Sequence, residues 1–263
     1  MARIGIAQLL FSQGFGNRRV CAGVVQLGLV RVAGRVLDDA HESFDTEGLV
    51  FEVEGQAWTC HAKALLMLHK PAGYECSQKP RHHPSVMSLL PAPLRTRGVQ
   101  PVGRLDEDTT GLLLFTDDGA LIHRLTSPKH HVDKVYEVGT KHPLDETQLQ
   151  RLRDGVVLDD DPAPVRAVAA EQITDTHLRL TLGEGKYHQV KRMLAAVGNR
   201  VETLHRSRFG PWVLTADLAP GQWRWLNVAD LPVSAKPAAP GAASTSAAAS
   251  AASATSAAPA ARG

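Results

Sequence analysis

The chain has 263 residues, a formal net charge of +2 and 43% hydrophobic residues. This length allows one large domain plus a small one, and the near-neutral balance excludes a chain that is basic throughout. No run of 18 apolar residues occurs, so we expect no membrane-spanning helix. Its three cysteines are widely spaced and form no disulfide framework, which is typical of a cytoplasmic protein.

The N-terminal segment is predicted to form a small basic unit. Its first 37 residues contain no acidic residue but five arginines, namely Arg3, Arg18, Arg19, Arg31 and Arg35. Apolar residues near positions 7–10 predict a first helix, and Asn17 is placed to cap a second helix that ends at Gly28. Alternating valines then predict strands at 30–32 and 50–53. Such a unit is typical of a polyanion-binding module, although solvated surface arginines remain an alternative.

This layout resembles the S4 RNA-binding domain. The matching residues are Asn17-Arg18-Arg19, Gly28, Val30, Val32 and Gly34. The chain departs from that family in its first helix, where Arg3-Ile4-Gly5-Ile6 replaces the usual Arg-Leu-Asp-Lys run, and Asn17 stands where Ser is usual. The resemblance implies that residues 1–61 bind RNA. Arginines in the first turn of a helix favour phosphate because free N–H groups and the helix dipole lie beside them.

A larger domain is predicted over residues 62–233. Apolar runs predict buried strands at 65–68 and 112–115, residues 132–138 predict a further strand, and alternating leucines predict another at 178–182. Residues 119–125 predict a helix capped by Asp117 or Asp118, and residues 190–197 predict another that Gly198 ends. The Pro-, Arg- and His-rich residues 78–98 are interpreted as an irregular connection. Residues 234–263 are rich in Ala, Ser and Pro, and we expect disorder there because they bury too little apolar surface.

The most informative segment is Gly103-Arg104-Leu105-Asp106, followed by Asp108-Thr109-Thr110-Gly111-Leu112. A buried strand follows directly, so these polar residues are expected at the mouth of a packed core. A carboxylate beside a guanidinium stays ionised there and is available as a nucleophile. Taken alone, Asp106 is more typical of a turn or cap residue.

This segment resembles the signature loop of pseudouridine synthases, in particular of the RsuA-type branch that modifies ribosomal RNA. The resemblance extends over most of the chain and makes Asp106 the catalytic residue, with Arg104 orienting it or filling the place of a flipped base. His69-Lys70-Pro71 resembles another family motif in which Asn is usual at the first position. We expect Lys70 and Lys134 to contact RNA. Tyr136, on the same strand face as Lys134, is implied to pack on the target uracil.

The run Gly185-Lys186-Tyr187-His188-Gln189-Val190-Lys191-Arg192-Met193 carries a third resemblance. It implies that Lys191 is the basic partner of the catalytic carboxylate. We expect His188, Gln189 and Arg192 to contact RNA or brace the site. Arg206 is a further candidate RNA contact, with ordinary surface as the alternative.

The implied fold is α+β, with the small S4-like domain followed by a mixed, largely antiparallel sheet and flanking helices. The implied reaction isomerises uridine to pseudouridine without redox change, so we expect no cofactor. We also expect no metal, since the adjacent pairs His82-His83 and His130-His131 are poor chelates.

Short runs such as Leu125-Thr126-Ser127-Pro128 and Leu218-Ala219-Pro220-Gly221 resemble the small-subunit branch most. We therefore expect a monomer that acts on 16S ribosomal RNA, free or within an assembling small subunit. The alternatives are a 23S enzyme of the same family, a non-catalytic RNA-binding or ribosome-assembly factor, and a metal-dependent phosphodiesterase that uses Glu107 and Asp108.

Overall fold

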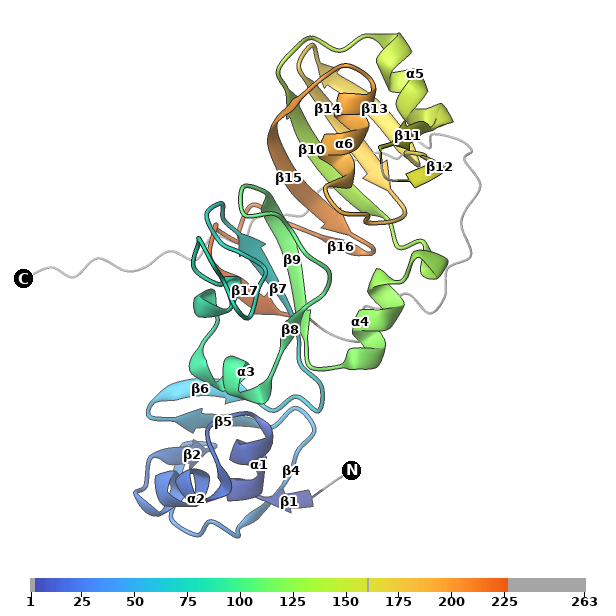
Figure 1. Cartoon of the computed structure of the whole chain (residues 1–263). Coiled ribbons are helices and arrows are strands. Elements are labelled where there is room, and N and C mark those ends of the chain that lie inside the picture. The colour runs from blue at the N-terminus through green and yellow to red at the C-terminus, as the bar shows by residue number, and fades with distance from the viewer. Residues whose placement is uncertain (1–2, 160, 227–263) are drawn as a thin grey trace, which may run out of the picture. The chain divides into compact units, whose positions relative to one another are not determined.

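The computed structural model describes residues 3–159 and 161–226, so the predicted tail and residues 227–233 of the predicted larger domain lie outside the described residues. The described part combines helices with a large, mainly antiparallel sheet, which confirms the α+β prediction. Figure 1 shows the order of these elements along the chain. None of the helices described is long and apolar enough to cross a membrane.

The N-terminal region has its own apolar core. Its elements are β1 (Arg3–Gly5), α1 (Ile6–Ser12), α2 (Arg18–Gln26), β2 (Val30–Val32), β3 (Arg35–Leu37), β4 (Ser43–Asp45), β5 (Val50–Val53) and β6 (Gln56–Thr59). The strands form a sheet in the order β3-β2-β5-β6 and a separate β1-β4 pair. Asn17 caps α2 as predicted, because its side chain accepts a hydrogen bond from the Val20 N–H. The buried side chains of this core all come from residues 6–60.

Most of the strands after the N-terminal region form one large sheet. Its strands are β7 (Leu65–Lys70), β8 (Gln100–Pro101), β9 (Thr110–Thr116), β10 (Lys134–Thr140), β13 (Ala169–Thr174), β14 (His177–Leu182), β15 (Val201–Phe209), β16 (Trp212–Val213) and β17 (Trp223–Trp225). The main order is β13-β14-β10-β15-β9-β7-β17, while β8 pairs with β9 and β16 with β15. Among the described pairs of this sheet, only β9 and β15 run parallel.

A glycine permits that parallel contact. Gly111 of β9 lies opposite Arg206 of β15 and has a φ of +107°. A Cβ at this position would lie 2.3 Å from the Arg206 carbonyl oxygen, so a side chain would push the two strands apart. The close approach joins the two halves of the sheet just beyond the Asp106 loop.

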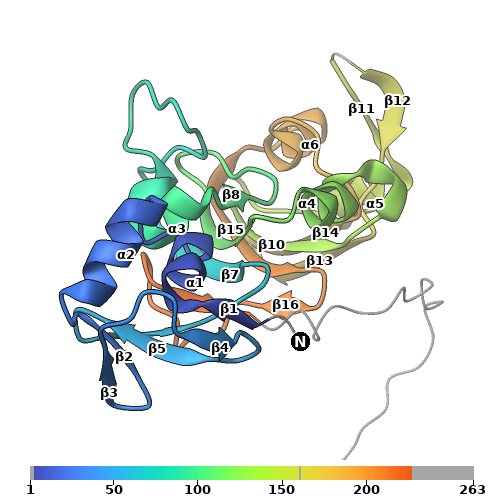
Figure 2. The same ribbon diagram turned by 90° about the horizontal axis from the view of Figure 1, so that it is seen from below.

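Helices cover the sheet. They are η1 (Val86–Leu89), α3 (Ala92–Arg97), α4 (Gly119–Thr126), η2 (Pro128–His130), α5 (Glu146–Asp154) and α6 (Gln189–Ala196), and a separate hairpin consists of β11 (Val156–Leu158) and β12 (Asp161–Val165). Figure 2 shows α5 and α6 on the same side of β10, β13 and β14. Alternate residues of β7 and β9 belong to two different apolar clusters, so the sheet is covered on both faces.

Several sequence expectations need correction. Residues 78–98 are not wholly irregular, because η1 and α3 form within them, and Leu94 of α3 is fully buried. The strand predicted at 132–138 begins at Lys134 and extends to Thr140. Of the two predicted candidates for the cap of α4, Asp118 is the one that caps the helix, which agrees with the prediction, while Asp117 pairs with Arg97 at 2.5 Å.

Candidate active site

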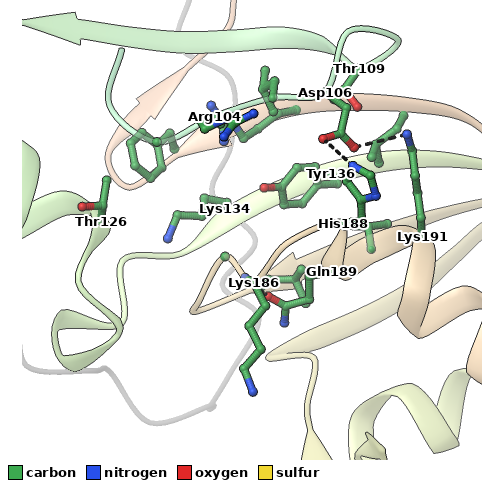
Figure 3. A pocket seen from close by; sticks show the side chains of 18 of the residues that line it. Arg104, Asp106, Thr109, Thr126, Lys134, Tyr136, Lys186, His188, Gln189 and Lys191 are labelled. Atoms are coloured by element: carbon green, nitrogen blue, oxygen red, sulfur yellow. Dashed lines mark hydrogen bonds and ion pairs between the residues drawn. The ribbon is translucent and has the colours of Figure 1, made fainter. Parts of the chain in front are cut away.

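A pocket opens where the loop before β9 meets β10, β15 and the start of α6. Its cavity has a volume of about 120 Å³, and its lining includes Arg104, Asp106, Lys134, Tyr136 and Lys191. Figure 3 shows Asp106 at one end, Tyr136 in the middle and Lys134 beyond Tyr136. An enclosed cavity of about 150 Å³ admits benzene, so this open pocket suits a single pyrimidine ring.

Asp106 is held between two donors from the α6 region. The His188 Nε2 lies 3.2 Å from one carboxylate oxygen, and the Lys191 Nζ lies 3.2 Å from the other. His188 reaches this position because it precedes α6 in a left-handed conformation with a φ of +48°. We did not predict the contact between His188 and Asp106 from the sequence. It depends on the left-handed backbone of His188, which no sequence pattern indicated.

Asp108 shares the ammonium group of Lys191. Both Asp108 carboxylate oxygens lie 2.8 Å from the Lys191 Nζ, closer than the Asp106 oxygen. Burial alone raises the pKa of Asp108, but the hydrogen bond and charge of Lys191 outweigh it, and the net pKa is below the ordinary value. For Lys191, burial lowers the pKa, but the two carboxylates outweigh it and raise the pKa above the ordinary value. Lys191 therefore stays protonated between two acids.

Lys70 occupies a different place from the one we expected. It is fully buried, and its Nζ donates to the carbonyl oxygens of Pro71, Glu107 and Thr109 at 3.1, 3.2 and 2.8 Å. Burial lowers the pKa of Lys70, although nearby acids act in the opposite direction. A fully buried ammonium cannot contact RNA, so Lys70 instead fixes the backbone of the loop that carries Asp106.

Lys134 and Tyr136 project from the same face of β10, as predicted. They are 7% and 8% exposed, so both are buried in the pocket wall. Burial, together with the charge of Arg206, lowers the pKa of Lys134 to about 8. The Tyr136 ring lies between Lys134 and the Asp106–His188 pair (Figure 3), where it offers a flat apolar surface.

The two predicted arginines of the site lie at different depths. Arg104 is exposed and lines the pocket, but among the described residues no ion pair joins it to Asp106. Arg206 is 3% exposed, so it is not ordinary surface. Its Nε donates to the Leu112 carbonyl oxygen at 2.8 Å, whereas its Nη2 is buried without a hydrogen-bond partner.

The remaining candidates divide into bracing and surface residues. Gln189 is buried and accepts from the Lys186 N–H at 2.8 Å, so it braces the loop before α6. Arg192 donates to the Tyr187 carbonyl oxygen at 3.2 Å. In the N-terminal region Arg3, Arg18, Arg19 and Arg31 are exposed, while exposed Arg35 forms an ion pair with Glu42.

No group of three or more His, Cys, Asp or Glu side chains within residues 3–159 and 161–226 is arranged to hold a metal ion. The three cysteines Cys21, Cys60 and Cys76 are free thiols and are all buried. The chemistry available in the pocket is therefore that of a carboxylate, an imidazole, an aromatic ring and several cations.

The sequence of this chain is similar to those of several known proteins. Residues 64–196 match a family model described as RNA pseudouridylate synthase. The chain is 44% identical over 221 residues to ribosomal small subunit pseudouridine synthase A of Salmonella typhimurium, covering 84% of this chain and 95% of that protein. It is 46% identical over 171 residues to the Escherichia coli K12 protein of the same name, covering 65% and 74%.

A solved pseudouridylate synthase is also similar in structure. It is 33% identical, has a TM-score of 0.61, and the match covers 86% of this chain and 97% of that one. Residues 64–196, which match the family model, contain Asp106, Tyr136 and Lys191, and these three side chains line the pocket. On the strength of these matches, the chain belongs to the RNA pseudouridylate synthase family.

Proposed function

We propose that this protein converts a uridine of 16S ribosomal RNA into pseudouridine, with Asp106 as the nucleophile. The observation that carries the proposal is the Asp106 carboxylate, held in an open pocket by His188 and Lys191 at 3.2 Å each. The names of the similar proteins refer to the small ribosomal subunit, which supports a 16S target over a 23S target.

The reaction breaks the bond between N1 and C1′, turns the base and joins C5 to C1′. It requires no oxidant, no net water and no metal, but it requires a nucleophile, a surface that keeps the detached base, and removal of the C5 proton. Asp106 attacks C1′ or C6, and Lys191 orients its carboxylate. Tyr136 provides the surface on which the base turns, because its ring lies beside Asp106 (Figure 3).

The target nucleotide must leave its stack, which costs a few kcal/mol. The exposed Arg104 at the pocket offsets this by binding the phosphate backbone, aided by Arg192 near α6. Residues 1–61 act as the S4-like RNA-binding domain and residues 62–233 as the catalytic domain. The separate apolar core formed by residues 6–60 supports this division. The protein acts as a monomer in the cytoplasm, on free 16S RNA or on an assembling small subunit.

Tritium release from RNA labelled at uridine C5 tests the function. We expect the protein to release tritium from a 16S transcript and not from a 23S transcript. Asp106→Asn should lower the rate about 10⁶-fold, the scale seen when a catalytic nucleophile is removed. Asp145→Asn is the matched control, because Asp145 caps α5 and Asn caps a helix equally well.

Each other outcome contradicts a defined part of the proposal. Release from 23S RNA alone would make the target wrong. Release that persists in Asp106→Asn would remove Asp106 as the nucleophile. No release from either RNA, with binding retained, would favour the non-catalytic RNA-binding factor.

A further inference from the structure

Two buried cations, Lys134 and Arg206, line the pocket. Arg206 is opposite Tyr136 in the pairing of β10 with β15, and Lys134 is two residues before Tyr136 on β10. The Lys134 Nζ and the Arg206 guanidinium carbon lie 5.2 and 5.1 Å from the centre of the Phe209 ring. One aromatic ring therefore supports both positive charges.

Neither cation has an acidic partner within the part of the chain that the structure describes. The Lys134 Nζ donates to the Val132 carbonyl oxygen at 2.8 Å, and the Arg206 Nε donates to the Leu112 carbonyl oxygen at 2.8 Å. The Arg206 Nη2 has no hydrogen-bond partner, although it is buried. Asp133 and Glu184 act on Lys134 only through their charge.

Such an arrangement is unfavourable in the absence of an anion. A buried charge without a partner costs free energy, and two like charges that share one site repel each other. The pKa of Lys134 is lowered first by burial and then by the charge of Arg206, so the charged form of Lys134 is already destabilised. Unfavourable local arrangements are typically kept at functional sites, where they serve the reaction.

We propose that Lys134 and Arg206 bind the carbonyl edge of the target uracil and stabilise the negative charge that the ring acquires during isomerisation. This inference rests on the proposed function and adds to it the groups that stabilise the leaving base. Lys134 and Arg206 both line the pocket, so they can supply hydrogen-bond donors to a charge that develops only during the reaction.

Both routes open to Asp106 place negative charge on O4 of the ring. If an Asp106 oxygen bonds to C1′, the N1–C1′ electron pair passes to the ring, and the uracil anion spreads its charge over N1, O2 and O4. If the oxygen bonds to C6, the electron pair of the C5–C6 double bond moves through C4 to O4. In the first route C5 then bonds to C1′ and displaces the Asp106 oxygen. In the second route C5 bonds to C1′ as the N1–C1′ bond breaks with its electron pair going to N1, and the Asp106 oxygen later leaves C6. In both routes C5 loses its proton and N1 gains one, so the base ends neutral and Asp106 is regenerated as a carboxylate. A cation pair beside the carbonyl edge therefore lowers the barrier in both routes.

A backbone phosphate is the other anion that an RNA could supply. Phosphate oxygens stay hydrated and are met by exposed cations, and Arg104 already provides one at this pocket. Lys134 and Arg206, at 7% and 3% exposure, can be reached only by a group that enters the pocket itself. A flat base that has left its stack fits that requirement, and a phosphate serves as the competing outcome of the test.

Lys134→Met tests the proposal, with single-turnover consumption of the target nucleoside measured at saturating RNA. With uridine at the target, we expect a loss of about 10²-fold, as found when one such donor is removed, with the Kd for RNA nearly unchanged. With 5-fluorouridine at the target, the loss should be clearly smaller, because fluorine withdraws charge from the ring and less stabilisation is needed. Lys141→Met, an exposed lysine just beyond the other end of β10, is the matched control and should react at the wild-type rate.

A second variant covers the partner cation. Arg206→Lys keeps a positive charge but removes the Nη2 donor, so we expect a smaller loss than in Lys134→Met and the same dependence on fluorine. The proposal is overturned if Lys134→Met reacts at the wild-type rate, or if its loss is equal for both bases. A weaker Kd with a reduced salt slope and an unchanged rate would instead assign the pair to a phosphate. If the proposed function itself is wrong, the wild-type protein will consume neither uridine nor 5-fluorouridine. That result differs from every outcome that overturns only the role of Lys134 and Arg206.

Discussion

Single side chains determine the electrostatics of this pocket. Asp106 and Asp108 both contact Lys191, so the chain places two carboxylates on one ammonium. Asp108 holds Lys191 with both oxygens, which leaves Asp106 with one contact to Lys191 and one to His188. Asp106 is therefore oriented by two donors, and its side chain is still 29% exposed in the open pocket.

Lys134 should make stability depend on pH in a specific window. Its pKa is about 8 in the folded protein and near 10.5 in the unfolded chain, so the unfolded state binds more protons between these values. The free energy of unfolding should therefore rise by about 3 kcal/mol from this group between pH 8 and 10.5. Lys134→Met should remove that rise and raise the free energy of unfolding at pH 7 by up to about 3 kcal/mol.

Denaturant titrations of wild type and Lys134→Met at pH 7, 8, 9 and 10 measure this difference, while other groups that titrate in the window cancel between the two proteins. Lys141→Met should follow the wild-type curve. A variant that is less stable than wild type at pH 7 would mean that Lys134 stabilises the fold, contrary to its burial without an acidic partner.

Strand pairing assembles the pocket from distant segments. The parallel contact of β9 with β15 brings the end of the Asp106 loop beside Arg206, and β10 lies on the other side of β15. Lys70, at the end of β7, then fixes the loop through the carbonyl oxygens of Glu107 and Thr109. The site thus depends on the separation between β9 and β15.

Gly111→Ala should therefore disrupt both the fold and the site. The added Cβ would meet the Arg206 backbone at 2.3 Å and would force a side chain into a left-handed conformation, so we expect a loss of at least about 2 kcal/mol in the free energy of unfolding. Activity should fall as well, because Arg206 and the Asp106 loop move apart. Gly119→Ala is the control: no atom lies within 4 Å of its Cβ, and Ala favours helix α4. Equal stability of the two variants would show that β9 and β15 tolerate separation.

Across the described chain, two regions carry the positive charge that the proposed function assigns to RNA binding. One is the pocket, and the other is the exposed start of α2, where Arg18 and Arg19 follow the Asn17 cap. Arg35, in contrast, is paired with Glu42 and contributes less net charge to an RNA surface. The residues around α2 have their own core, so changes to their exposed arginines leave the pocket intact.

The double variant Arg18→Gln with Arg19→Gln should weaken RNA binding in a salt-dependent way. Each lost phosphate contact lowers the slope of log K against log salt by about 0.7 to 0.9, so the pair should lower it by up to about 1.8. The single-turnover rate at saturating RNA should not change. Filter binding at several salt concentrations measures the slope, and Arg35→Gln should change it less. An unchanged slope in the double variant would contradict the RNA-binding role of the N-terminal domain.

Much of the local structure is readable from neighbouring residues. Asn17 and Asp118 cap the helices that follow them, and Gly198 ends α6 with a φ of +82°, all as predicted. The buried strand after the Asp106 loop and the apolar face of α6 were also correctly predicted. Caps, periodicity and turns involve residues only a few positions apart, so the sequence expresses them directly.

The sequence by itself determined the family and the type of most core elements, and it singled out Asp106, Tyr136 and Lys191, which line one pocket in the structure. Only the tertiary structure decided that Lys70 holds a loop, that Asp108 shares Lys191 across 83 positions, and that Arg206 is buried against Leu112 across 94 positions. The physical reason is that burial and ion pairing depend on which strands pack together. In this chain that depends on the approach of β9 to β15, which no local pattern encodes.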